Sequence, residues 1–164
     1  MRNEQHAVLT EAADAGFLGG TTVAIWFLIR DLLAGHPLRT PSVLGQYFLL
    51  GEPHPDAQHL IFGAVVLYTA VHFIVFVLFA LAVALLMRLA VEQPAVRFAL
   101  LVLFVTFEFC FYVLVNTVSE EVGALFPLWT VLAANLLASA VMAAYFWRRY
   151  PEFVRILRAE PLGA

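Results

Sequence analysis

Long apolar runs, separated by short polar segments, dominate the pattern of the chain. Four runs have the roughly 20 residues that a helix needs to cross a bilayer, and they cover about residues 13–34, 59–87, 98–118 and 125–147. The second run exceeds the minimum length, so we expect it to tilt or to project beyond the bilayer. The pattern predicts an all-α fold, a four-helix transmembrane bundle in which residues 1–164 form a single membrane domain.

The segment between the first and second spans differs from the other connections. Residues 35–58 are rich in proline and glycine and include a short apolar piece at 43–50. This piece is too short to span, so it predicts an amphipathic, outward-facing loop that lies in the interface or folds back over the mouth of the bundle. Pro94 suits the first turn of the third span, and we expect the fourth span to begin near Leu125 and to tolerate Pro127 in its first turn.

Composition supports the membrane assignment. The chain is 63% hydrophobic and only 13% charged, whereas about a quarter of the residues in a soluble protein are charged. The single cysteine, Cys110, excludes a disulfide framework and a cysteine-based zinc site within one chain. The chain has no basic stripe, so we expect no nucleic-acid partner. Acidic residues near the N-terminus argue against a cleavable signal peptide, and the first run is expected to act as its own insertion signal.

Arginine counting predicts the orientation, because cytoplasmic loops carry an excess of positive side chains. Four spans would place both termini and the hinge at 91–97 on one side. That side would hold Arg2, Arg88, Arg97, Arg148, Arg149, Arg155 and Arg158, and the other side would hold Arg30 and Arg39. We therefore expect a multi-pass protein of the bacterial inner membrane with both termini in the cytoplasm. Residues 148–164 would form a cytoplasmic tail that contains a short surface helix.

Small residues recur every fourth position in the first span, at Ala12, Gly16, Gly20 and Ala24. Such a stripe allows another helix to approach closely, which is how helices associate in lipid. We expect Gly16, Gly20 and Ala24 to be helix-packing residues; the alternative is a permissive face with no partner.

Glu108 is the one carboxylate in the middle of the third run. At about 1.5 Å per residue it lies roughly 16 Å above Arg97, and His72 lies roughly 20 Å below His59. In a hydrocarbon core of about 30 Å the two side chains would share one level, and Asn135 on the fourth span reaches a similar depth. A charge at this depth is costly and usually faces protein, so we expect these groups to point inward.

Neighbouring polar residues extend this level into an intramembrane polar cluster. Tyr112 and Asn116 follow Glu108 at intervals of four, and Tyr68 precedes His72 by four. A buried His–Glu couple could carry protons, since burial moves the pKa values of an acid and an imidazole toward each other. It could instead hold a metal or a small polar ligand, or act as a structural node that fixes helix register.

Cofactor binding has weaker support in the sequence, and the identity of any cofactor stays open. A b-type haem held by two histidines would need a second subunit, because His72 is the only histidine at depth. In the outward loop, His54, Asp56 and His59 are plausible metal ligands, but their spacing matches no specific motif. Helix capping alone would explain Asp56.

Two segments carry a resemblance to known sequences. Residues 19–41, GGTTVAIWFLIRDLLAGHPLRTP, and residues 145–151, YFWRRYP, resemble the corresponding parts of small bacterial four-span membrane proteins of unassigned function. The resemblance implies an inner-membrane location and four spans, and it implies no catalytic residue.

No motif for a nucleophile, a nucleotide or a catalytic zinc ion is present. We therefore expect a non-enzymatic accessory or structural subunit of a larger inner-membrane complex, with the lipid bilayer and other membrane subunits, or further copies of the chain, as partners. The alternatives are a proton- or ion-handling transport protein that uses His72 and Glu108, and a haem- or metal-binding membrane subunit.

Overall fold

The computed structural model describes residues 2–117 and 120–159. Within these ranges, the side chains at 2–5, 92, 94–95, 111–112, 114–117, 120–121 and 157–159 lie outside the description. The described chain is helical, with no strand in these ranges. Its helices are α1 (Arg2–Leu33), α2 (Arg39–Leu49), α3 (Phe62–Glu92), α4 (Pro94–Thr117), α5 (Glu120–Leu125), α6 (Leu128–Arg149) and α7 (Pro151–Ala159).

Three helices are long and apolar enough to cross a membrane, judged on the described residues. They contain the segments His6–Leu33 in α1, Phe62–Val91 in α3 and Leu128–Arg149 in α6. The remaining predicted span, the third at 98–118, coincides with α4, several of whose side chains are not described. An all-helical protein with three candidate spans is therefore what the described chain supports.

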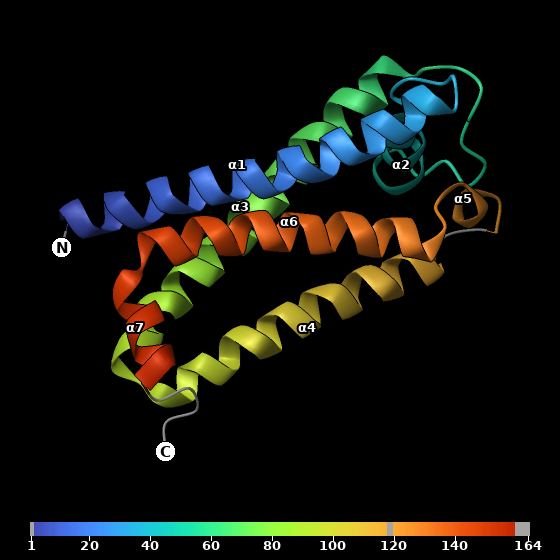
Figure 1. The fold of residues 1–164 in the computed structure, drawn as a ribbon. Coiled ribbons are helices and arrows are strands. Elements are labelled where there is room, and N and C mark those ends of the chain that lie inside the picture. The colour runs from blue at the N-terminus through green and yellow to red at the C-terminus, as the bar shows by residue number, and fades with distance from the viewer. Residues whose placement is uncertain (1, 118–119, 160–164) are drawn as a thin grey trace.

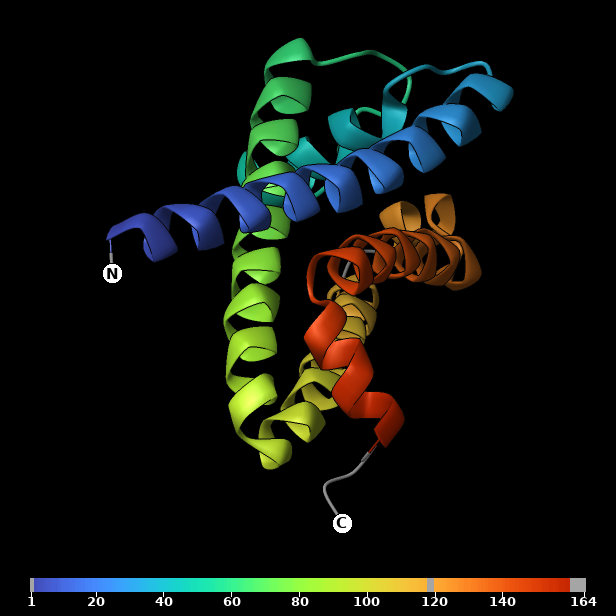
Figure 2. The same ribbon diagram turned by 60° about the vertical axis from the view of Figure 1, so that its left-hand side comes forward.

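Helix α3 is the element on which the others assemble. It packs against α1, α2, α4 and α7. Figures 1 and 2 show α1 crossing α3, with α6 lying beside α1. Helix α4 turns back from the end of α3 and makes little contact with α6, which it approaches only near α5 (Figure 1).

Prolines lie at three of the helix boundaries: Pro94 begins α4, Pro127 precedes α6 and Pro151 begins α7. Helix α4 begins at Pro94, as predicted. Proline is tolerated in the first turn of a helix because the backbone N–H that it lacks would have no intrahelical hydrogen-bond partner there. The expectation that Pro127 sits inside the fourth span is wrong. Phe126 N–H closes α5 on the Gly123 carbonyl, and α6 begins after Pro127, whose carbonyl accepts from the Thr130 backbone and hydroxyl.

The loop between the first and second spans is more ordered than the sequence pattern indicated. Its apolar piece at 43–50 belongs to α2, which starts at Arg39 and folds back against α3. Gly45 allows this contact, because a Cβ at Gly45 would collide with the Ala64 carbonyl. The polar side chains of Ser42 and Gln46 are buried on the inner face of α2.

Small side chains fill the main core. Alanines of α1, α3 and α6 pack around Phe76 and Met142, and the buried members of this core are Val8, Ala12, Ala15, Val23, Phe76, Ala80, Ala84, Met87, Ala90, Ala134, Ala138, Met142, Phe146 and Phe153. Large apolar residues such as Ile74 and Leu78 instead face outward. This distribution is the one expected in lipid, where close packing of small residues holds helices together.

Candidate functional site

Glu108 lies on α4 with its carboxylate turned toward α6. The Nδ2 group of Asn135 donates to Glu108 Oε2 at 3.4 Å, which is at the long limit for a hydrogen bond. Asn135 is buried and Glu108 is half-buried. The other oxygen, Glu108 Oε1, is buried and has no hydrogen-bond partner among the described residues. Burial without a donor is unfavourable for a carboxylate oxygen, so this atom is a place where a donor or a proton would be stabilising.

His72 lies on α3 and turns toward α1. Its Nε2 donates to the Gly20 carbonyl at 3.0 Å. A carbonyl only accepts, so Nε2 carries the proton, and Nδ1 of the neutral ring is an acceptor. The ring stacks on Tyr68, with centroids 6.0 Å apart, and packs against Phe76 at 4.8 Å.

The structure brings Glu108 and Asn135 together but does not join either of them to His72. Among the described residues the hydrogen bonds of Glu108 and His72 lead to Asn135 and Gly20, respectively. The Phe76 ring contacts both His72 and Phe107, the residue before Glu108, so aromatic rings connect the two sites. The side chains of Tyr112 and Asn116 lie outside the described residues.

Two of the three predicted packing residues of α1 face α3. A Cβ at Gly16 would lie 2.5 Å from Val77 Cα, and a Cβ at Gly20 would lie 3.0 Å from the Phe73 ring. The backbones of α1 and α3 therefore approach as closely as a glycine permits. Ala24 is exposed.

A charged cluster that we did not infer from the sequence lies near the N-terminal end of α1. Glu11 is buried and accepts from Arg149 Nε at 2.9 Å, from Arg88 Nη2 at 3.4 Å and from the Tyr150 hydroxyl at 2.5 Å. Burial raises the pKa of the Tyr150 hydroxyl, and its hydrogen bond to Glu11 adds to the shift. The phenol therefore stays protonated and keeps donating.

A sequence signal for this cluster exists. Glu11 falls between Val8 and Ala15 at intervals of three and four, which is the buried face of α1. An acid on that face requires partners, and arginines lie near the end of α3, at Arg88, and in the last turn of α6. Which arginines meet it depends on how the helices cross.

The loop between α2 and α3 is organised by Asp56. Its Oδ1 accepts from the backbone N–H groups of Gln58 and His59, and its Oδ2 pairs with His59 Nδ1 at 2.8 Å. The Gln58 and His59 hydrogen bonds hold the pKa of Asp56 below its usual range. Gln46 of α2 donates to the Asp56 carbonyl and accepts from its N–H, which ties the loop to α2.

The proposed metal ligands of this loop are only partly brought together. Asp56 and His59 are paired, while the His54 backbone bonds to the Glu52 carboxylate. In the described part of the chain, no three side chains of histidine, cysteine, aspartate or glutamate are grouped to hold a metal ion.

Comparison with known proteins does not assign the chain. No protein-family model, curated protein or solved structure matches it. The resemblance carried by residues 19–41 and 145–151 stays a prediction, and function has to be argued from the geometry.

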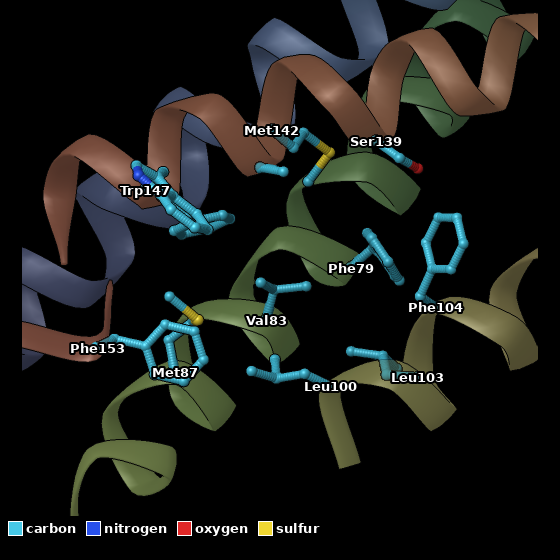
Figure 3. A pocket seen from close by; sticks show the side chains of 12 residues that line it. Phe79, Val83, Met87, Leu100, Leu103, Phe104, Ser139, Met142, Trp147 and Phe153 are labelled. Atoms are coloured by element: carbon cyan, nitrogen blue, oxygen red, sulfur yellow. The ribbon is translucent and has the colours of Figure 1, made fainter. Parts of the chain in front are cut away.

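A cavity of about 210 Å³ lies between α3, α4, α6 and α7. Figure 3 shows its walls, which come from α3, α4, α6 and α7 and are apolar except at Ser139. Phe104 and Ser139 line it, and each lies one helical turn from a member of the Glu108–Asn135 pair. The Glu108–Asn135 pair therefore lies where the contact between α4 and α6 ends. Toward the N-terminal end of α4 and the C-terminal end of α6, this cavity lies between the two helices.

Proposed function

We propose that the protein is a non-enzymatic membrane subunit that binds another membrane protein through α4. The observation that carries the proposal is Glu108 Oε1, a buried acceptor that has no donor among the described residues. Because the Glu108 side chain is only half-buried, a rotation of its carboxylate would present this oxygen to a partner helix, whose hydroxyl, amide or imidazole N–H at this depth would supply the missing hydrogen bond. Polar contacts of this kind between membrane helices contribute about 0.6–2 kcal/mol.

The surface of α4 supports the same proposal. Phe98, Leu101, Val105 and Phe109 recur at intervals of three and four and are all exposed. They form an apolar stripe that runs past Glu108, on a helix that makes little contact with α6. This exposed stripe leaves one face of α4 free for a neighbour.

We further propose that α4 also crosses the membrane, as the third of four spans, which gives a four-helix membrane bundle in the bacterial inner membrane with both termini in the cytoplasm. Helix α4 has 24 residues, enough to cross the hydrocarbon core. The arginine bias between the two sides supports the orientation.

The proton-handling alternative draws less support from the geometry, because it needs a path between Glu108 and His72. Phe76 and Phe107 lie along the contacts that connect them, and aromatic rings do not relay protons. The haem alternative would have to use Nδ1 of His72 as the axial ligand, because Nε2 donates to the Gly20 carbonyl at 3.0 Å, and it needs a second axial ligand from another chain. A visible absorption spectrum of the purified protein tests it.

Photocrosslinking in the native membrane tests the proposed function. A photoreactive phenylalanine analogue in place of Val105 would sit on the α4 stripe, and the same analogue in place of Ile74, an exposed residue of α3, serves as the matched control. We expect a discrete crosslinked product from position 105 and a much weaker one from position 74. The mass of the product tells a second copy from a different subunit. A lone monomer at both positions, together with a monomeric mass after mild extraction, would contradict the proposal.

Substitution of the carboxylate tests whether Glu108 takes part. Glu108→Leu removes both acceptors, so the yield of the position-105 product should fall about threefold or more, the equivalent of a hydrogen bond of about 0.6 kcal/mol or more. Cys110→Ser changes an exposed position on the same helix and should leave the yield unchanged.

A further inference from the structure

A second cavity lies beneath α2, apart from the α4 surface. It is a partly open pocket of about 220 Å³ that lies between α1, α2, α3 and the turn that precedes α2. This exceeds the roughly 150 Å³ of an engineered protein cavity that takes up a benzene molecule. The walls are apolar for the most part, with Phe27 and Leu28 from α1 and Leu38 from the turn.

The turn that closes this cavity is strained. Leu38 has φ +62°, in the left-handed region, which a residue with a branched side chain rarely adopts. It immediately precedes α2, whose first turn is held by Asp31: the Thr40 N–H and hydroxyl donate to its two oxygens at 2.7 and 2.8 Å. Asp31 and Thr40 are both buried at this edge of the cavity. An unfavourable backbone conformation maintained by buried hydrogen bonds is a frequent feature of ligand sites.

Two polar side chains of α3 line the cavity with unused hydrogen-bonding capacity. The Nε2–H group of His72 donates to the Gly20 carbonyl, which leaves Nδ1 as an acceptor without a donor among the described residues. The Tyr68 hydroxyl has no hydrogen-bond partner among the described residues, and its ring stacks on the His72 ring. An apolar cavity with a few convergent polar groups is the usual form of a small-molecule site.

We infer that this cavity binds a small, neutral aromatic molecule that carries a hydroxyl group, of the phenol or quinol class. The hydroxyl would donate to His72 Nδ1 and accept from Tyr68, and the ring would pack against Phe27. A charged ligand would lose its hydration in these apolar walls. An aliphatic ligand would forgo the aromatic contacts. The inference is independent of the partner proposed for α4.

Titration calorimetry of the purified full chain in detergent tests the inference with 4-propylphenol and its methyl ether as probes. The phenol should bind, and the ether should bind about threefold to tenfold more weakly, because it cannot donate to His72. Equal binding of phenol and ether would overturn the inference.

Two matched pairs of variants locate the site. Ala24→Phe fills the cavity from an exposed position of α1 and should abolish the heat of binding, while Ala13→Phe, exposed elsewhere on α1, should preserve it. The heat that remains with Ala24→Phe also measures how much of the phenol partitions into the detergent micelle.

His72→Leu should weaken phenol binding to the level of the ether, and His36→Leu, exposed and outside the cavity, should have no effect. Binding that survives Ala24→Phe unchanged would overturn the inference even if His72→Leu failed to fold.

Discussion

Glu11 is a buried carboxylate that receives donors from Arg88, Arg149 and Tyr150. Removing both charges from such a cluster can be neutral, whereas removing one member leaves the others buried without compensation. Glu11 therefore acts as the common acceptor at one end of the molecule, and it joins α1 to α3 and to the end of α6.

Glu11→Gln tests this role. The amide keeps the size of the side chain but weakens three charge-assisted hydrogen bonds, so unfolding in detergent should become easier by about 1.5–3 kcal/mol. Asp14→Asn alters an exposed acid one turn away, whose one hydrogen bond among the described residues is from the Tyr145 hydroxyl at 3.3 Å, and it should change stability by less than about 0.5 kcal/mol. Equal effects of the two substitutions would show that the Glu11 cluster has no special role.

Asp56 should make the outward loop sensitive to acid. Its folded pKa is lowered by hydrogen bonds to Gln58 and His59, so the stabilisation is present above the unfolded value of 3.8 and is lost as pH falls through the folded value. Hydrogen exchange of the loop amides, corrected for intrinsic rates, should show protection at about pH 6 that decreases progressively as the pH is lowered below 3.8. Asp56→Asn cannot titrate, so its protection should change little, and an equal loss in both proteins would assign the effect to another group.

At the scale of helices, close approach of backbones is the main source of cohesion. Gly16 meets the backbone of α3 at Val77, and Gly45 meets the backbone at Ala64. Lipid tails are as apolar as leucine, so burial of large apolar side chains cannot drive these helices together. Close backbone contacts at glycines, which a Cβ atom would prevent, hold the helices together instead.

Gly16→Ala should therefore destabilise the protein, although alanine is the better helix former. Overpacking costs about 1–3 kcal/mol, which exceeds the helical gain of about 0.5–1 kcal/mol. Gly63→Ala in the first turn of α3 meets nothing within 4 Å and should stabilise by that gain alone. Thermal unfolding in detergent measures both, and stabilisation by Gly16→Ala would contradict the observed contact with Val77.

Helix existence was predictable, while helix boundaries depended on local chemistry. Pro94 was correctly expected at the start of α4, because proline fits only the first turn of a regular helix. Pro127 was misplaced, because the short helix α5 closes on Gly123 and forces a break that hydropathy does not register. The packing of α2 on α3 was equally invisible in the pattern, since its buried positions include Ser42 and Gln46.

The proposed orientation of the whole molecule leads to a direct test. In a Cys110→Ser background, His54→Cys in the outward loop should react with a membrane-impermeant maleimide in intact cells. Glu152→Cys, which is also exposed, should react only after the cells are opened. The expectation follows from the arginine bias. The reverse labelling pattern would place the termini outside.

The sequence by itself determined that this is a helical protein with membrane-spanning segments. Apolar length is a property of each segment alone, and a helix in lipid satisfies its backbone hydrogen bonds within that segment. The same reasoning placed Glu108 and Asn135 at one depth, since depth follows from residue number along a helix of fixed rise.

Only the tertiary structure decided which side chains meet. Glu11 pairs with residues 77 and 138 positions away, and His72 turns to the Gly20 carbonyl instead of toward Glu108. Helix rotation and crossing decide these pairings. In lipid, helix rotation and crossing are set by the fit of small residues such as Gly16 against Val77. The hydrophobic pattern of the sequence does not predict this fit.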